Sequence, residues 1–304
     1  MKELSFLVLP EQAKMRLDLL LAEYANKNNL GLSRTNIQKL ITSGKVFLNS
    51  SAVSKPHRKV NLAEEVRIIL PERQETQILP EQISLDVVYE DDDLAIINKP
   101  PGLVVHPAPG NLVHTLVNAL LSRFEFLSDI NKNRPGIVHR LDKETSGLLV
   151  IAKNNASHLK LAKQFAEHSI ERKYIAIVLG KVEFDEDVIE APIGRHPLKR
   201  KNMSVNFSEN TRYAKTLYRT LKRSNDYSLL ELRPFTGRTH QLRVHLDFLG
   251  YPILGDIKYG KNNTFSRMAL HAQEIGFIHP STGKFIHFSS EIPPEFKEFI
   301  KKNF

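Results

Sequence analysis

The chain of 304 residues contains no cysteine and no tryptophan. Without cysteine it can form neither disulfide bonds nor thiolate metal sites, and this composition suits a reducing compartment. No run of apolar residues is long enough to cross a bilayer, and the opening stretch, MKELSFLVLPEQ, brings in acidic residues and a proline too early for a signal peptide. We therefore expect a cytoplasmic protein that does not enter a membrane.

Several sequence signatures of enzyme chemistry are also missing. The chain has no GxxxxGK[ST] phosphate loop, no GxGxxG, no HExxH and no GxSxG. Its 12 histidines show no recognisable zinc spacing. The sequence HRLD at 139–142 differs from the HRD catalytic loop of protein kinases by an inserted leucine, and DFG is absent. These absences argue against ATP-dependent chemistry and against a metal site.

The charge is strongly basic and unevenly distributed. The formal net charge is +9, and residues 24–63 contain seven Lys or Arg but no acidic residue. Residues 74–98 reverse the pattern, with seven acidic residues and no basic one, and residues 195–223 contain nine basic residues and a single acidic one. Two basic segments separated by an acidic one suggest two surfaces that meet one polyanion, although for each segment alone a solvated face is the favoured interpretation.

The first part of the chain has the pattern of a compact helix–helix–strand–strand unit. Apolar side chains recur every three or four residues over 15–26, and again over a segment that begins at Ser33, a residue type favoured at helix N-caps. Gly44 fits the position just after this second helix. Residues 45–49 and 66–70 are predicted to be strands, with a turn at 49–52.

Three basic residues, Arg34, Lys39 and Lys45, lie on the second predicted helix and at the turn that follows it. A positive helix end beside a basic hairpin can bind a phosphate backbone without contacting the bases. The stretch RLDLLLAEY…LSRTNIQKLITSGKVFLNSSAVSKPHRKV resembles a small RNA-binding domain named after a ribosomal protein of the small subunit (S-four type), over residues 13–72. Residues 61–65 depart from the Gly-Asp turn that is frequent there. We expect these three side chains to bind RNA.

A second domain follows a polar stretch. Residues 71–80, PERQETQILP, are bracketed by prolines and predict a linker, so we divide the chain into a domain at 13–72, a linker at 73–82 and a second domain at 83–304. A β-hairpin is predicted to turn at Asp91–Asp93. The spacing of the predicted elements is not a regular βαβ alternation, which indicates an α+β fold with a mixed sheet. Helices are predicted at 112–124, 155–168, 239–249 and 294–301, and strands at 87–90, 94–98, 148–152, 173–179, 228–233, 269–278 and 284–289.

Charged residues are crowded into GIVHRLDKETSGLLVIAK, residues 136–153. Arg140 and Asp142 are two residues apart, so in an extended segment both point to the same side. A second cluster lies in TGRTHQLRVHL, residues 236–246, and Tyr174 follows two cations at the start of a predicted strand. Each of these features alone is more often structural, because turns, core strands and helix ends commonly contain such residues.

Taken together these motifs carry a resemblance. The stretches NKPPGLVVHPAPGN, RPGIVHRLDKETSGLLVIAK, ERKYIAIVLG, PFTGRTHQLRVHLDFLGYPILGD and ALHAQEIGFIHP occur in this order. They resemble the large-subunit ribosomal RNA pseudouridine synthases of the RluA/RluD class, over about residues 83–290. The resemblance implies a synthase-type catalytic domain whose mixed, largely antiparallel sheet is flanked by helices.

The resemblance also implies roles for four residues. Asp142 matches the aspartate on which catalysis depends, and Tyr174 matches the tyrosine that stacks on the target base. Arg243 matches the arginine paired with that aspartate, and Arg140 matches the arginine that enters the RNA and helps to extrude the nucleotide. His139, Lys143 and Glu144 have no assigned role beyond framing the loop.

The implied reaction fits the missing motifs. Uridine becomes pseudouridine when the bond from ribose C1′ to N1 breaks, the base turns, and C1′ bonds to C5 instead. Because no atom is lost and no net redox change occurs, we expect no cofactor and no metal. An arginine nearby would keep Asp142 ionised, and a base inside an RNA stem-loop must first be flipped out, at about a few kcal/mol.

The resemblance is nearest to the subgroup that acts on the helix 69 stem-loop of large-subunit ribosomal RNA. We therefore expect this RNA, free or in a precursor particle, to be the partner of a monomeric enzyme. Three alternatives stay open: a synthase acting on other large-subunit uridines or on tRNA, a non-catalytic RNA-binding assembly factor, and an RNA hydrolase that uses Asp142.

Overall fold

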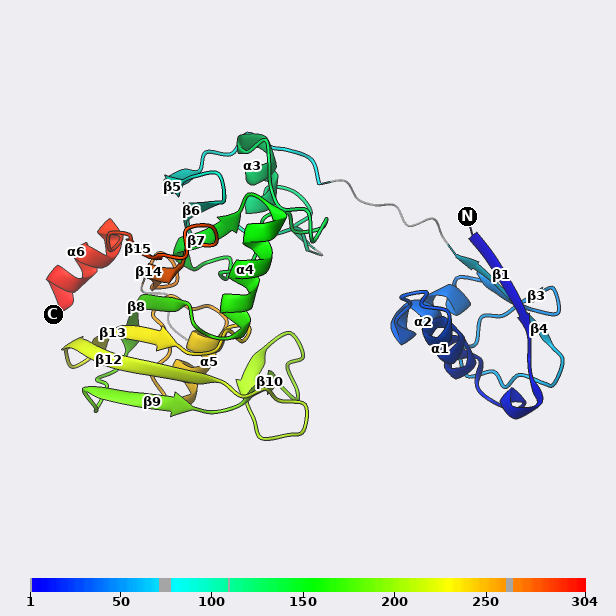
Figure 1. The fold of residues 1–304 in the computed structure, drawn as a ribbon. Coiled ribbons are helices and arrows are strands. Elements are labelled where there is room, and N and C mark those ends of the chain that lie inside the picture. Colours follow the sequence, from blue (N-terminus) through cyan, green and yellow to red (C-terminus); the bar gives the residue numbers. More distant parts are fainter. Residues whose placement is uncertain (1, 71–77, 109, 261–264) are drawn as a thin grey trace. The chain divides into compact units, whose positions relative to one another are not determined.

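A computed structural model describes residues 2–70, 78–108, 110–260 and 265–304. The chain divides into two compact units, Met1–Gln77 and Ile78–Phe304 (Figure 1). Of the predicted linker, residues 73–77 lie outside the described residues. Residues 78–82 belong to the larger unit, where the backbone N–H of Glu81 donates to the carbonyl of Asn118.

The small unit packs two helices against a four-stranded sheet. Helices α1 (Leu17–Lys27) and α2 (Arg34–Thr42) bury apolar faces that include Leu20 and Ile37. Both helix ends of α2 form as predicted, because the Ser33 side chain accepts the Asn36 N–H and Gly44 adopts a positive φ of 68°. The sheet order is β1-β4-β2-β3, with β1 (Lys2–Leu7), β2 (Val46–Leu48), β3 (Ser51–Ala52) and β4 (Glu65–Leu70).

Strand β1 was missed by the sequence analysis, which placed no element before residue 13. It pairs antiparallel with β4 along its whole length, from Lys2 opposite Leu70 to Leu7 opposite Glu65. A single short strand without a hairpin partner nearby gives no local turn signal, so this pairing comes from a contact between distant parts of the chain.

The large unit is built on one nine-stranded sheet, which confirms the α+β fold with a mixed, largely antiparallel sheet. The strand order is β5-β6-β7-β14-β8-β13-β12-β9, β15 pairs with the second half of β14, and only the β7–β14 pair is parallel among the described strands. Its strands are β5 (Asp86–Glu90), β6 (Leu94–Lys99), β7 (Ser146–Ala152), β8 (Glu171–Leu179), β9 (Glu186–Glu190), β12 (Lys215–Arg223), β13 (Tyr227–Pro234), β14 (Leu270–Ile278) and β15 (Phe285–Ser289).

Helices cover both faces of this sheet (Figure 1). On one face, Leu161 of α4 (Asn155–Ala166) packs on Leu94 and Ile96. On the other face, α3 (Leu116–Arg123), α5 (Gln241–Phe248) and α6 (Pro294–Asn303) pack on the alternate residues of the same strands, such as Ile97. This alternation follows from the pleat, which points successive side chains to opposite faces. None of the described helices combines the length and the apolarity that crossing a membrane requires.

Four strands between residues 186 and 223 were not predicted. They are β9, β12 and the small hairpin of β10 (Ile193–Arg195) and β11 (Met203–Val205). From the sequence, residues 195–223 were predicted only to form a basic surface. Arg219, Leu221 and Lys222 are exposed on β12, while Thr216 and Tyr218 are buried.

In the large unit, two predicted helix starts were also wrong by a few residues. Helix α3 begins at Leu116 rather than 112, because Thr115 and Asn118 form a capping box there. Helix α5 begins at Gln241 rather than 239, because His240 adopts a left-handed conformation with φ of 57°.

Gly147 allows two strands of the sheet to approach closely. It lies opposite Ala272 in the parallel pairing of β7 with β14 and has a φ of 111°. A Cβ at this position would collide with the backbone of Ala272. Only glycine therefore lets β7 start beside β14, and the charged loop at 139–145 ends at this point.

Candidate active site

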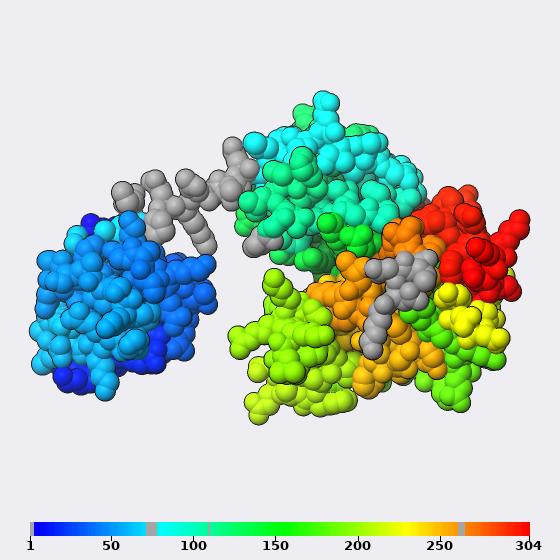
Figure 2. Space-filling view, turned by 180° about the vertical axis from the view of Figure 1, so that it is seen from behind, coloured from blue at the N-terminus to red at the C-terminus, as the bar shows by residue number. Residues whose placement is uncertain are grey.

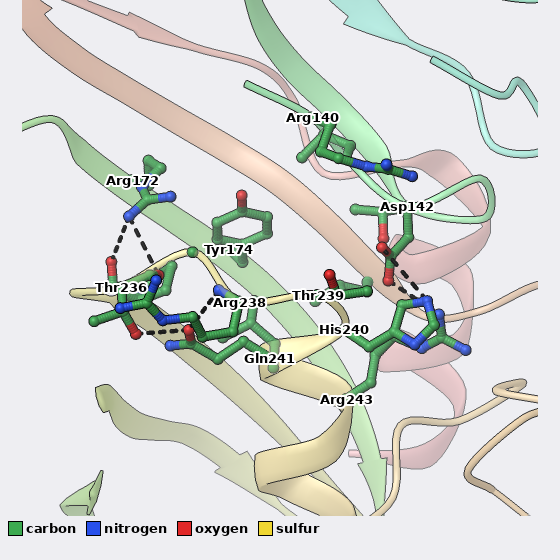
Figure 3. Close-up of a pocket in the computed structure, with 16 residues that line it drawn as sticks. Arg140, Asp142, Arg172, Tyr174, Thr236, Arg238, Thr239, His240, Gln241 and Arg243 are labelled. Atoms are coloured by element: carbon green, nitrogen blue, oxygen red, sulfur yellow. Dashed lines mark hydrogen bonds and ion pairs between the residues drawn. The ribbon is translucent and has the colours of Figure 1, made fainter. Parts of the chain in front are cut away.

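The charged loop before β7 and the start of α5 meet at one pocket of the large unit (Figure 3). The two segments are about a hundred residues apart in the sequence. The loop leads into β7 and α5 follows β13, and one sheet holds these strands in the order β7-β14-β8-β13. The pocket is lined by Arg140, Leu141, Asp142, Thr145, Arg172, Tyr174, Pro234, Thr236, Gly237, Arg238, Thr239, His240, Gln241, Leu242, Arg243 and Leu270.

Asp142 and Arg243 form an ion pair in this pocket. The Nη1 of Arg243 donates to Oδ2 of Asp142 over 3.0 Å, and the side chains are 19% and 9% exposed for Asp142 and Arg243. The Nε2 atom of His240 lies 3.9 Å from the other carboxylate oxygen. The carboxylate thus faces a fixed positive charge on one side while remaining open to the pocket.

Arg243 is itself held from behind by Asp256, a residue that the sequence analysis did not single out. Its Nε and Nη2 atoms donate to the two Asp256 oxygens over 2.6 and 2.8 Å. Backbone N–H groups of Lys258 and Tyr259 donate to the same carboxylate. Burial opposes the charge on Arg243, but these bonds and the charge of Asp142 outweigh it and raise the pKa of Arg243.

Tyr174 forms part of the floor of the pocket. It lies on β8, is 8% exposed, and points its ring toward the space beside Asp142 (Figure 3). Burial raises the pKa of its phenol, so the side chain stays neutral. Arg172, two residues earlier on the strand, donates to the carbonyl of Pro234 over 3.0 Å and so ties β8 to the loop that leads to α5.

The family model for RNA pseudouridylate synthase matches residues 93–248, which contain Asp142, Tyr174 and Arg243. The chain belongs to this family. It is 42% identical to the Bacillus subtilis protein named uncharacterized RNA pseudouridine synthase YlyB, over 99% of this chain and 98% of that protein. It is 41% identical to ribosomal large subunit pseudouridine synthase D of Zymomonas mobilis, over 96% and 94% of the two chains.

The fold leads to the same family. The solved structure of human RNA pseudouridylate synthase domain containing 1 matches with a TM-score of 0.58 and 27% identity, over 69% of this chain and 84% of that one. The predicted class of the chain is therefore confirmed, and the protein is an isomerase that acts on RNA.

Of the other residues in the pseudouridine synthase motifs, some lie at the pocket and others lie away from it. Arg140 is an exposed residue at the mouth of the pocket, beside Asp142 (Figure 3). His245, which shares a sequence cluster with His240, lies away from the pocket. It is fully buried on the other side of α5, where its ring contacts the Thr216 hydroxyl and the Ala191 carbonyl.

His139, left without a role by the sequence, anchors the loop. Its Nε2 accepts the backbone N–H of Val150 on β7 over 3.0 Å, and its ring stacks on Phe165 of α4 at 4.4 Å. Burial lowers the pKa of His139 to about 3, which keeps the ring neutral and able to accept.

Lys99 supports the same loop from beneath. It is fully buried, and its Nζ donates to the carbonyls of Pro100, Leu103 and Lys143. Burial lowers the pKa of Lys99 to about 7. The backbone of Lys143 therefore has a structural function, one residue after Asp142, while Glu144 lies near enough to favour the charge of Lys99.

The three basic residues of the small unit differ in their surroundings. Lys39 and Lys45 are exposed. Arg34 is half exposed and forms an ion pair with the buried Asp18 over 3.1 Å. Burial opposes the charge of Asp18, but hydrogen bonds from Arg16, Gln38 and Arg34 lower its pKa to about 2. Part of the charge of Arg34 is thus neutralised within the unit.

One cluster in the large unit has the residue types of a metal site. Oxygens of Asp91 and Asp93 and a nitrogen of His279 lie within 4.8 Å of one another. His279 donates to Asp91 through Nε2 and accepts backbone N–H groups through Nδ1. Asp93 accepts from Asn154 and other side chains of the same corner. These hydrogen bonds explain why the three side chains lie together, because they stabilise the turn of the β5–β6 hairpin.

Proposed function

We propose that this synthase isomerises specific uridines of large-subunit ribosomal RNA, in the helix 69 stem-loop. The observation that carries the proposal is the pair of Asp142 and Arg243 beside the buried Tyr174. Relatives named ribosomal large subunit pseudouridine synthase D, such as the Zymomonas mobilis protein, support ribosomal RNA as the substrate.

In the proposed mechanism Asp142 is the catalytic group. Its carboxylate, paired with Arg243 over 3.0 Å, acts at the sugar or at the base while the C1′–N1 bond breaks. The detached base stacks on Tyr174, turns, and rejoins through C5, and the proton lost from C5 is replaced by one at N1. A flat aromatic ring suits this step because stacking holds a base without fixing its rotation.

The target must leave its stem-loop before it reaches this pocket. We propose that Arg140, exposed at the mouth of the pocket, fills the gap that the flipped nucleotide leaves. The basic segment 195–223 and the cations Arg34, Lys39 and Lys45 of the small unit would supply affinity for phosphates that falls as salt rises. In this proposal the small unit is the S-four-type RNA-binding domain.

The proposal extends to the setting of the reaction. The enzyme acts as a monomer in the cytoplasm, where large subunits are assembled, and takes part in ribosome biogenesis. No cofactor enters the proposed reaction, since bond breaking and bond formation balance within one nucleotide.

Two experiments test the proposal. Primer-extension mapping of pseudouridines in ribosomal RNA from a deletion strain should show the loss of sites in helix 69, and their restoration by the wild-type chain. Asp142→Asn should fold, bind RNA and restore none. Loss of sites elsewhere in the large subunit or in tRNA would show that the enzyme modifies a different substrate. If no site is lost, a binding protein would be favoured over an enzyme.

A further inference from the structure

The hydroxyl of Tyr259 joins two parts of the large unit. It accepts the backbone N–H of Met203 over 3.0 Å and lies 2.7 Å from Nδ1 of His240. A hydroxyl can accept two hydrogen bonds and donate one, and an amide N–H can only donate. Of the two described groups bonded to this hydroxyl, only Nδ1 of His240 can therefore accept its proton. We assign the directions that give this proton an acceptor: Met203 donates to Tyr259, and Tyr259 donates to Nδ1 of His240.

This direction fixes the form of the His240 ring. A neutral imidazole carries one proton, and Nδ1 must be the unprotonated nitrogen if it accepts from Tyr259. The proton is therefore on Nε2, the atom that lies 3.9 Å from Oδ1 of Asp142. The opposite tautomer would turn a lone pair toward the carboxylate. The surroundings agree with a neutral ring, since burial lowers the pKa of His240 to about 4 even though Asp142 opposes the shift.

The other end of the chain of hydrogen bonds is the β10–β11 hairpin. Met203 opens β11, and the turn before it contains the exposed cations Lys199, Arg200 and Lys201. A second bond joins the two segments, because Nζ of Lys258 donates to the Lys201 carbonyl over 2.8 Å. In Figure 2 this yellow-green part of the chain projects from the large unit.

The segment 256–259, which is hydrogen-bonded to the β10–β11 hairpin, also binds Arg243 of the pocket. Asp256 accepts from both Arg243 and the backbone of Tyr259, and the Arg243 guanidinium lies 4.9 Å from the centre of the Tyr259 ring. The basic hairpin, Tyr259 and the two groups facing Asp142 are thus parts of one connected structure, held by bonds of 2.6 to 3.1 Å.

We propose that Tyr259 is a positioning residue that transmits the placement of the β10–β11 hairpin to His240, and so holds Nε2–H of His240 toward Asp142. The inference rests on the proposed function of the pocket, and it adds that full activity requires the hairpin to be in place against Tyr259. A polyanion bound by the hairpin cations stabilises the hairpin against Tyr259, and this contact orders the imidazole beside the catalytic carboxylate. Catalysis and hairpin placement are thereby coupled through one hydroxyl group.

Tyr259→Phe removes this hydroxyl and keeps the ring that packs against Arg243. With a helix 69 RNA, kcat should fall about tenfold, because a buried hydrogen-bonding group loses its partner. The dissociation constant for the RNA should change less than about twofold. Tyr89→Phe is the matched control, since it also removes a hydroxyl bonded to a polar side chain, Asp91, at a hairpin that does not line the pocket. It should keep the wild-type kcat.

Nitrogen NMR of histidine-labelled protein gives a readout that a general loss of packing would not move. The wild-type His240 resonances, assigned by their loss in His240→Gln, should show Nε2 protonated, and Tyr259→Phe should shift them toward a mixture of tautomers. In a His240→Gln background, adding Tyr259→Phe should lower kcat by less than about twofold further.

Wild-type His240 protonated at Nδ1 would overturn the inference without any variant. So would a Tyr259→Phe enzyme with unchanged kcat and unchanged His240 resonances, or equal losses in kcat with and without the His240 side chain. A wild-type chain that makes no pseudouridine in any ribosomal RNA would instead refute the proposed function, and the nitrogen spectra would still decide the tautomer.

Discussion

Replacing Asp256 by asparagine tests how Arg243, the arginine paired with Asp142, is held. Asp256 is 1% exposed and accepts four hydrogen bonds, two from Arg243 and two from backbone N–H groups. Asparagine has nearly the same shape but only one oxygen. If the asparagine oxygen takes the place of Oδ1, the NH₂ group takes the place of Oδ2 and faces the Nε–H of Arg243, so one bond loses its acceptor. If the amide is rotated by 180°, the NH₂ group takes the place of Oδ1 and the other three bonds lose their acceptor.

The expected size of the effect follows from this geometry. Removing one partner of a buried ion pair costs about 3–5 kcal/mol. Because Arg243 keeps its bond to Asp142, we expect the lower end, about 3 kcal/mol in the free energy of unfolding of the large unit. Arg243 also loses its fixed orientation, and a displacement of about 1 Å at a catalytic site can cost about 100-fold in kcat.

Urea denaturation and single-turnover kinetics on a helix 69 RNA measure the two effects. Asp226→Asn, which changes an exposed carboxylate in the turn between β12 and β13, serves as the control and should alter neither. An Asp256→Asn enzyme with wild-type stability and wild-type kcat would refute the conclusion that Asp256 positions Arg243.

Three further predictions follow from other parts of the structure. Lys99→Met removes three hydrogen bonds that a fully buried side chain makes to carbonyls, so the free energy of unfolding in urea should fall by about 2–4 kcal/mol, and a neutral result would contradict a supporting role. Burial lowers the pKa of the His271 imidazole to about 4, so between pH 7 and pH 5 only the unfolded chain takes up its proton. The unfolding free energy should drop by about 2 kcal/mol from this residue as the pH falls, and the drop should shrink in His271→Asn. Tyr174→Phe keeps the stacking ring and should retain kcat within about fivefold, whereas Tyr174→Leu should lose about 10- to 100-fold, corresponding to about 1–3 kcal/mol of stacking. Equal losses in the two variants would argue against stacking.

Local signals explain which parts of the fold could be predicted. The cap at Ser33, the glycine after α2 and the hairpin turned at Asp91–Asp93 depend on residues close in sequence, and all three form as predicted. Strand β1 depends on pairing with the distant strand β4. Strand β12 pairs with β13 across the short turn at 224–226 and with the more distant β9, and its many cations made it look like a solvated basic segment until these partners were known.

The candidate active site, too, could be predicted from the sequence only in part. The motifs indicated Asp142, Tyr174, Arg140 and Arg243, and the structure brings these four to one pocket. Asp256 was missed although it ends the quoted stretch PFTGRTHQLRVHLDFLGYPILGD, because nothing in a spacing of 13 residues shows that its carboxylate turns back onto α5. Tyr259 and its bond to His240 likewise depend on a turn that only the fold supplies.

The central claim is that Asp142 carries the chemistry. Tritium release from ribosomal RNA labelled at uridine C5, measured in a single turnover with excess enzyme, tests it most directly because the C5 hydrogen is lost only when C5 bonds to ribose. We expect release by the wild-type chain and none by Asp142→Asn at an RNA concentration that both proteins bind equally. Measurable release by Asp142→Asn would contradict the claim.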